Sequence, residues 1–226
     1  MSVNESILSN LQGAMKANRP LDLLSSFKGV PVRYKASIQQ IREEVVTVQA
    51  PPPEAVCLEL EREVVVLGEG AEEALRASVV AVQLSSGIAQ LSHLRYADSR
   101  LGNRLTVRVE PREPMLLRLG AGGRTFKGQV VDISMGGLAV QIFSPDEALL
   151  LKMRASVHIA FDLPSGPIEL VGIISSVKPA ADGKRLGIAF PQDAQVSIIV
   201  GYILQRRVEI LAELKAAYEA RVGSRQ

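Results

Sequence analysis

Short apolar runs with the two-residue alternation of β-strands fill residues 30–190, and turns rich in glycine, proline and serine separate them. Successive side chains of a strand point to opposite faces, so each run buries one face and exposes the other. Runs this short and this closely spaced are typical of small barrels or sandwiches. The ranges that we interpret as strands are 30–34, 37–41, 45–48, 56–60, 64–67, 75–84, 88–94, 105–109, 115–119, 126–133, 138–143, 153–161, 168–177 and 186–190.

The two ends of the chain have helical spacing instead. Residues 2–17 carry apolar side chains three and four positions apart, and the same spacing returns at Asp193 and continues to Tyr218. We expect residues 21–27 to form a short helical or irregular piece. The apolar stripe of the C-terminal helix can cover its own barrel or pair with a second copy of the chain, so a homodimer through this helix is one expectation.

Residues 95–104 hold three arginines and no apolar periodicity, which is typical of a linker. A chain of 226 residues is long enough for two domains of ordinary size. We therefore predict a mainly β chain with two small antiparallel β-barrel domains in tandem, an N-terminal helix and a long C-terminal helix. The predicted parts are residues 1–94, an arginine-rich linker or switch at 95–108, and residues 109–226.

The charge balance is close to neutral, with a net charge of +2. A nucleic-acid binder carries a concentrated basic surplus, so this balance argues against nucleic acid as a partner. The single cysteine, Cys57, excludes an internal disulfide and is expected to be a small buried side chain. We see no signal peptide, and the longest apolar run, 196–204, is about half as long as a membrane-spanning helix. We expect a cytoplasmic protein without membrane insertion.

Few residues could carry catalysis. The histidines, His93 and His158, each lie in a strand pattern, where a structural role is the simpler interpretation. A single cysteine leaves no set of thiolates and imidazoles for zinc. No histidine lies near Ser134 in the sequence to activate its hydroxyl. We therefore expect a protein that is not an enzyme and needs no metal or cofactor.

Two strand-like runs flank a tight polar corner that contains Asp132, Ser134, Gly136 and Gly137. Asp132 and Ser134 are two positions apart, so they project to the same side of a strand. A carboxylate accepts two parallel N–H donors, and glycine lets a backbone or a ligand approach closely. The corner is either a polar pocket or a turn whose side chains satisfy only nearby backbone groups.

Arginines recur every four residues at 100, 104, 108 and 112, just before the second predicted barrel. On a helix they would form one repulsive stripe, and the valines and proline between them favour a linker that passes into a strand. Guanidinium groups on such an arm can stack on a purine, bind phosphate, or bind O6 and N7 of guanine. Asp132 offers acceptors for the guanine edge that carries N–H donors.

These two motifs resemble the signature of the PilZ domain, in which R-x-x-x-R precedes D/N-x-S-x-x-G by roughly two dozen residues. Asp132-Ile-Ser-Met-Gly-Gly137 matches the second part. Arg104-Leu-Thr-Val-Arg108 fits the first part best, and Arg100-Leu-Gly-Asn-Arg104 is the competing register. The strand at 185–190 and the helix after it are also similar to this family. Residues 1–94 resemble, in architecture alone, the N-terminal domain of flagellar brake proteins.

The resemblance implies a bacterial receptor for cyclic di-GMP, with one or two ligands in its site. The residues that it assigns to the ligand are Arg104, Arg108, Asp132, Ser134, Gly137 and Arg100. It implies that binding changes the interdomain arrangement and signals to a protein partner in motility, exopolysaccharide or biofilm control, such as the flagellar motor. The alternatives are a degenerate PilZ scaffold that binds only proteins and a ligand-controlled transcription regulator.

Overall fold

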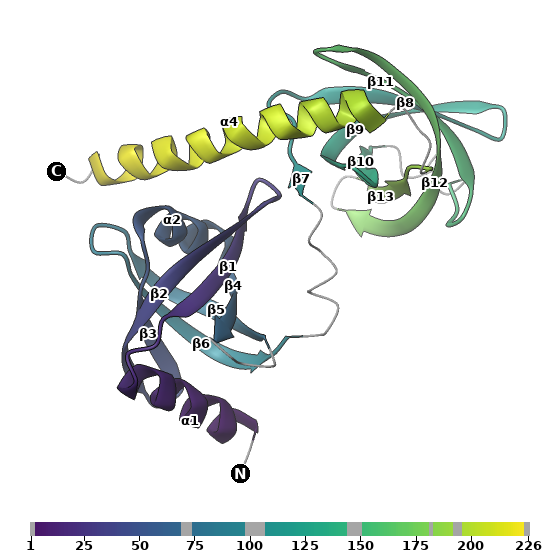
Figure 1. Ribbon diagram of the computed structural model, residues 1–226. Helices are drawn as coiled ribbons and strands as arrows, with labels where there is room; N and C mark the ends of the chain where they lie inside the picture. Colours follow the sequence, from purple (N-terminus) through teal and green to yellow (C-terminus); the bar gives the residue numbers. More distant parts are fainter. Residues whose placement is uncertain are drawn as a thin grey trace. The chain divides into compact units, whose positions relative to one another are not determined.

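The computed structural model describes residues 3–68, 74–97, 107–143, 151–180, 183–191 and 196–223 (Figure 1). The chain divides into two compact units, Met1–Leu105 with Ile210–Gln226, and Thr106–Glu209. Each unit is built on a closed antiparallel barrel, with helices near the two ends of the chain. The predicted mainly β fold, with two barrels in tandem, is therefore confirmed.

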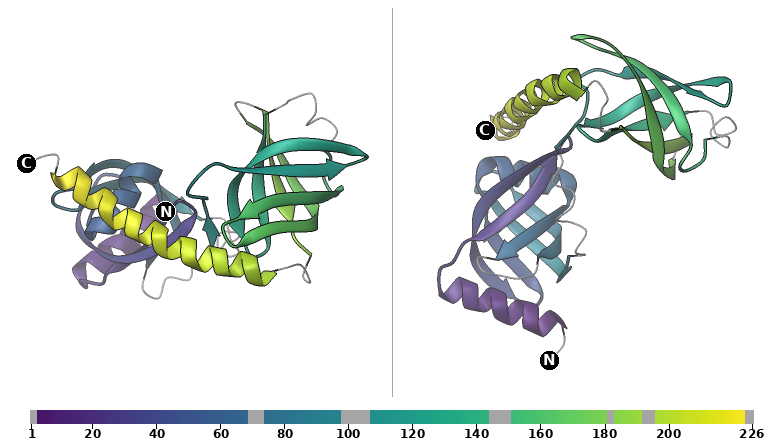
Figure 2. Two further views of the ribbon diagram at one scale, coloured as in Figure 1. Left: turned by 90° about the horizontal axis from the view of Figure 1, so that it is seen from above. Right: turned by 45° about the vertical axis from the view of Figure 1, so that its right-hand side comes forward.

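The first unit contains a barrel with the strand order β1-β2-β3-β6-β5-β4. Its elements are α1 (Val3–Lys16), β1 (Leu21–Phe27), β2 (Val30–Arg42), β3 (Val45–Gln49), α2 (Pro52–Glu61), β4 (Glu63–Gly68), β5 (Leu75–Gln83) and β6 (Ile88–Tyr96). Inward-facing aliphatic side chains of the strands form its core, and Ile7 and Leu11 of α1 join them. Helices α1 and α2 lie at opposite ends of this barrel (Figures 1 and 2).

Residues 21–27 form strand β1, so our prediction of a short helical or irregular piece is wrong. Leu21 and Leu23 are buried, and β1 pairs with β2 on one side and with β4 on the other. The alternation is hidden in the sequence because a serine, Ser25, stands in the buried row while a leucine, Leu24, stands in the outward row. Ser25 tolerates burial because its hydroxyl donates a hydrogen bond to Glu54 of α2.

Residues 56–60 lie in helix α2, so our prediction of a strand there is wrong. Pro52 and Pro53 occupy the first turn, where backbone N–H groups have no partner within the helix and proline costs little. Arg62, in the left-handed conformation, ends the helix, and its N–H donates to the carbonyl of Leu58. A run of five residues that is apolar except for Glu59 is too short to distinguish a strand from a helix by periodicity. Cys57, on this helix, is buried as predicted.

The second unit contains a barrel with the order β10-β13-β12-β11-β8-β9, which is closed by the pairing of β10 with β9. The short strand β7 pairs with the last residues of β9. Its strands are β7 (Arg108–Val109), β8 (Met115–Ala121), β9 (Arg124–Ser134), β10 (Gly137–Ile142), β11 (Ser156–Leu163), β12 (Gly166–Ala180) and β13 (Gly183–Ala189). They overlap the strands that we predicted over residues 105–190, although β11 begins at Ser156 rather than at residue 153, and their buried side chains form a second aliphatic core.

Helix α4 (Val196–Gly223) is the predicted C-terminal helix. Its residues before Ile210 belong to the second unit, and its residues from Ile210 on belong to the first. Within the described residues, no helix combines the length and the apolar character that crossing a membrane requires.

Candidate functional site

The polar corner is the connection between β9 and β10. Asp132 and Ser134 lie at the end of β9, and Gly137 begins β10. The Ser134 hydroxyl donates a 3.0 Å hydrogen bond to the carbonyl of Gly137, and the N–H of Phe190 donates to the carbonyl of Gly136 at 3.0 Å. The hydroxyl of Ser134 thus stabilises the turn in which it lies, and its oxygen can still accept a hydrogen bond.

Gly137 lets two strands approach each other closely at this corner. It pairs with Ala189 of β13, and a Cβ at position 137 would collide with the carbonyl oxygen of Ile188. Any residue with a side chain would push β10 away from β13. The glycine is therefore required by the closure of the barrel, beside any role in ligand binding.

A β-bulge turns Asp132 toward the outside of the barrel. Val130 and Ile133 are both buried, although an odd number of positions separates them and strict alternation would place them on opposite faces. The register between β9 and β10 shifts at this point, because Ala139 pairs with Asp132 while Val140 pairs with Val130. Bulges of this kind redirect side chains and are common beside functional sites.

Two arginines hold the carboxylate of Asp132. Arg108 Nη1 lies 3.3 Å from Asp132 Oδ1, and Arg185 Nη2 lies 2.7 Å from Asp132 Oδ2. The Asp132 side chain is only 10% exposed, whereas the side chains of Arg108 and Arg185 are 54% and 45% exposed. The group therefore presents a nearly buried anion between two accessible cations, with a net surplus of positive charge.

Strand pairing brings these side chains together from three parts of the chain. Arg108 lies opposite Ser134 in the β7–β9 register, and the buried Val109 anchors that short strand opposite Ile133. Arg185 comes from β13, on the other side of β10. The site therefore forms only when β7, β9, β10 and β13 assemble into one sheet.

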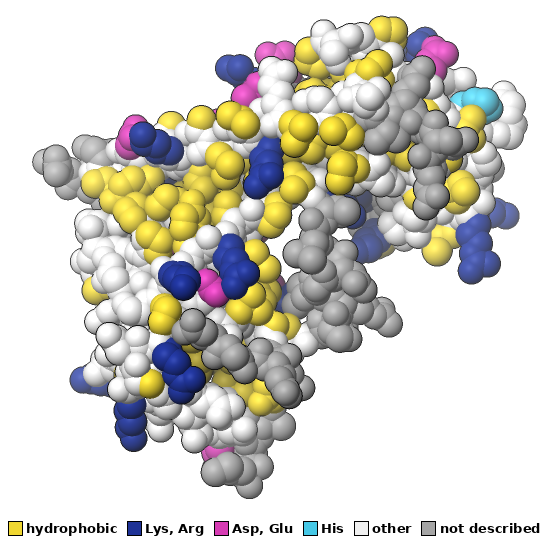
Figure 3. Space-filling view, viewed as in Figure 1, with side chains coloured by type: hydrophobic (Ala, Val, Ile, Leu, Met, Phe, Trp, Pro, Cys, Tyr) yellow, Lys and Arg dark blue, Asp and Glu magenta, His cyan; other side chains and the backbone are white. Residues whose placement is uncertain are grey.

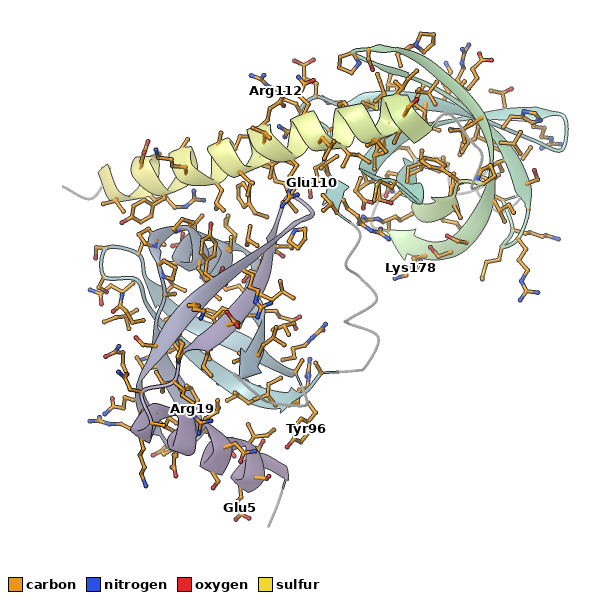
Figure 4. The ribbon with its side chains drawn as sticks, viewed as in Figure 1. Glu5, Arg19, Tyr96, Glu110, Arg112 and Lys178 are labelled. Atoms are coloured by element: carbon orange, nitrogen blue, oxygen red, sulfur yellow. The ribbon has the colours of Figure 1, made fainter. Side chains whose placement is uncertain are left out.

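A further cationic group lies on the same sheet. Lys178 of β12 is opposite Arg185 in the register and is exposed (Figure 4). Arg112, the last of the regularly spaced arginines, is exposed beyond the end of β7 and lies outside the strands (Figure 4). Arg108 and Lys178 offer exposed cationic groups that can bind phosphate, and the guanidinium of Arg108 can also stack on a purine ring.

The structure brings Arg108, Asp132, Ser134 and Gly137 together, all of which the sequence analysis selected. Arg100 and Arg104, together with most of the predicted 95–108 linker, lie outside the described residues, so the choice between the two arginine registers stays a prediction. Arg185 was missed as a site residue. Its position in a strand similar to the closing strand of the family was the available signal, but its neighbour Asp132 follows only from the sheet order.

Comparison with known families identifies the second unit. Residues 102–205 match the PilZ domain family. The chain thus carries a PilZ domain, as the two motifs predicted, and Asp132, Arg108 and Arg185 belong to it. No curated protein matches the chain.

Several solved structures are similar in fold. YcgR of Escherichia coli in complex with c-di-GMP is 13% identical, with a TM-score of 0.41, and the match covers 99% of this chain and 95% of that one. The inhibitor of motility MotI/DgrA of Bacillus subtilis is 14% identical, with a TM-score of 0.43 and coverage of 85% and 97%. The MrkH–c-di-GMP complex of K. pneumonia is 13% identical, with a TM-score of 0.41 and coverage of 96% of each chain.

Proposed function

We propose that this protein is a receptor for cyclic di-GMP and that the ligand binds at Asp132. The observation that carries the proposal is the nearly buried Asp132 carboxylate held between the exposed guanidinium groups of Arg108 and Arg185 within a PilZ domain. Asp132 accepts hydrogen bonds from N1–H and the 2-amino group of guanine, because each carboxylate oxygen has a second lone pair. Ser134 adds a hydroxyl beside it.

The two phosphates of the ligand explain why the R-x-x-x-R motif places arginines next to this site. A guanidinium group binds phosphate with two parallel hydrogen bonds and also stacks on a purine. Arg108 is exposed enough to turn from Asp132 toward a ligand. Arg104, which belongs to both registers, supplies a second guanidinium from the preceding segment, and in the other register Arg100 takes the place of Arg108. The proposed receptor performs no reaction on its ligand.

The signal would arise from the segment that carries these arginines. When residues 95–108 close over the second barrel, they change the arrangement of that barrel relative to a first domain at 1–94, and a protein partner detects the change. A flagellar motor component or the polysaccharide synthesis machinery fits such a signal. We place the receptor in the cytoplasm, where cyclic dinucleotides are made and where the free Cys57 is stable.

Calorimetric titration with cyclic di-GMP tests this function. We expect heat from binding with micromolar or tighter affinity, and a loss of about tenfold or more in Arg108→Ala and in Asp132→Ala, since each removes a charge-assisted hydrogen bond. The matched control is Arg118→Ala on β8, an exposed arginine whose register partner is Lys127 rather than a residue of the corner. A chain that releases no heat, or variants that bind as well as the control, would refute the proposal.

A second candidate function is a scaffold that binds only proteins through α4. The observation that favours it is a set of exposed apolar side chains on this helix, Leu204, Val208 and Leu211, which recur at helical spacing (Figure 3). Light scattering of the purified chain tests it. A stable dimer that cyclic di-GMP does not alter, and that Val208→Glu dissociates, would favour the scaffold over the receptor.

A further inference from the structure

Arg185 makes the shorter of the two contacts with Asp132. Its Nη2 donates to Oδ2 at 2.7 Å, a distance typical of a charge-assisted hydrogen bond, whereas Arg108 contacts Oδ1 at 3.3 Å. Arg185 belongs to neither of the two motifs on which the ligand site was predicted. Its strand, β13, lies between β10 and β12 in the barrel and is paired on both sides, so the backbone of Arg185 is held in place.

A nearly buried carboxylate needs a permanent partner. Asp132 is 10% exposed, and an anion in such a place loses hydration that a cation or a hydrogen-bond donor must replace. Arg108 cannot be that partner throughout if it turns to the ligand when the ligand binds. Arg185 occupies one oxygen from the opposite side of β10 and leaves a second lone pair on each oxygen for a guanine edge.

We infer that Arg185 is a positioning residue that orients the Asp132 carboxylate toward the N–H edge of guanine and thereby helps the site to select guanine. The inference rests on the proposed function. It predicts that Arg185 acts on the ligand through Asp132 and not by its own contact with a phosphate group.

The first measurement compares two ligands. In the inosine analogue of cyclic di-GMP each base lacks the 2-amino group, so Asp132 can accept only the N1–H bond. A site built to hydrogen-bond that amino group discriminates against the analogue. We expect Arg185→Ala to weaken cyclic di-GMP binding by about tenfold and to weaken the analogue much less, so that the ratio of the two affinities falls. Arg118→Ala should leave both affinities and their ratio unchanged.

A double-mutant cycle gives the second measurement. If Arg185 acts through Asp132, then Arg185→Ala has no further effect on cyclic di-GMP affinity in the Asp132→Ala background. Circular dichroism and thermal melting of every variant establish that the barrel is folded, and only folded variants enter the cycle. Should Arg185→Ala fail to fold, Arg185→Gln, which keeps most of the side-chain volume, takes its place in both measurements.

The outcomes separate the inference from the function on which it rests. A falling affinity ratio together with a non-additive cycle supports the positioning role. Equal weakening of both ligands, or additive effects in the cycle, shows that Arg185 contacts the ligand directly or only stabilises the barrel, and overturns the inference while cyclic di-GMP binding by the unaltered chain stands. No binding by the unaltered chain overturns the proposed function, and this inference with it.

Discussion

The hydroxyl of Ser25 donates a 2.5 Å hydrogen bond to Oε1 of Glu54 inside the first barrel. The other carboxyl oxygen, Oε2, is buried without a hydrogen-bond partner among the described residues. Burial raises the pKa of Glu54 to about 7, although the bond from Ser25 acts in the opposite direction. The charge of Glu54 helps to raise the pKa values of Tyr34 in β2 and Cys57 in α2, and neither of these neighbours is a cation. Glu54 is therefore best accommodated in its protonated form.

The first prediction concerns the pH dependence of the first barrel. The folded-state pKa of Glu54 lies above the ordinary value of 4.5, so the folded state binds the proton more tightly than the unfolded state. The stability that this provides is complete below pH 4.5 and is lost as the pH rises through about 7. We expect the free energy of unfolding to fall by up to about 3 kcal/mol across this range. Glu54→Gln should remove most of this dependence of the free energy of unfolding on pH, which we call the pH slope.

Labelling of Cys57 measures this unfolding selectively. The chain has one cysteine, it lies in the first unit, and burial raises the pKa of its thiol to about 12, so the folded barrel protects it. Pulse labelling of the thiol along a urea series, at several pH values, reports the unfolding of this barrel alone. Glu59→Gln, on the same helix, is the control that keeps the slope. A slope as steep in Glu54→Gln as in the unaltered chain would contradict the assignment.

The second prediction compares two adjacent glycines. Gly137→Ala forces a Cβ against the carbonyl oxygen of Ile188, whereas a Cβ on Gly136 meets no described atom within 4 Å. We expect Gly137→Ala to destabilise the second barrel by about 2 kcal/mol or more, and Gly136→Ala to change its stability by less than about 0.5 kcal/mol. Thermal unfolding of the two variants side by side makes the comparison, and equal melting temperatures would show that β10 and β13 can separate without cost.

The third prediction concerns two adjacent arginines of α4. The side chain of Arg206 is 3% exposed, its Nε donates to the carbonyl of Glu110 at 2.8 Å, and its Nη1 lies 3.1 Å from Glu209 Oε2. Arg207, the next residue, is exposed. We expect Arg206→Ala to cost about 2 kcal/mol in the stability of the second unit, because it leaves a cavity and an unpaired carbonyl. Arg207→Ala should be neutral. Urea unfolding followed by circular dichroism distinguishes the two variants, and an equally small effect of both would be contrary to this expectation.

The fourth prediction resolves the register of the arginine motif. Arg104 belongs to both registers, so the register Arg104–Arg108 predicts that Arg108→Ala weakens cyclic di-GMP binding by about tenfold or more, while Arg100→Ala has a smaller effect. Arg112→Ala, at the next position of the same spacing, is the control and should change the affinity less than about twofold. Calorimetry on the three variants decides the register, and a larger loss in Arg100→Ala than in Arg108→Ala would select the register Arg100–Arg104.

Much of the architecture follows from local patterns in the sequence. Alternation over 126–133 and 168–177, and helical spacing after Asp193, predict the strands and the last helix because burial on one side of an element imposes its period on the residues. The local patterns were insufficient where the environment overrides them. Ser25 is buried in β1 because it donates a hydrogen bond to Glu54, and residues 56–60, which are apolar except for Glu59, form a run too short to separate a helix from a strand.

The corner with Asp132, Ser134 and Gly137 could be found from spacing alone, since its residues are neighbours in the chain. The contact of Asp132 with Arg185 could not, because it depends on which strands lie side by side and on a bulge that turns one carboxylate outward. Strand order and register are set by the combined packing of the barrel. The backbone hydrogen bonds between strands depend little on which side chains the strands carry. For that reason the sequence by itself determines the periods of the strands and helices and the residues of the corner. The partner of a buried charge is determined only by the tertiary structure, when the sheet closes.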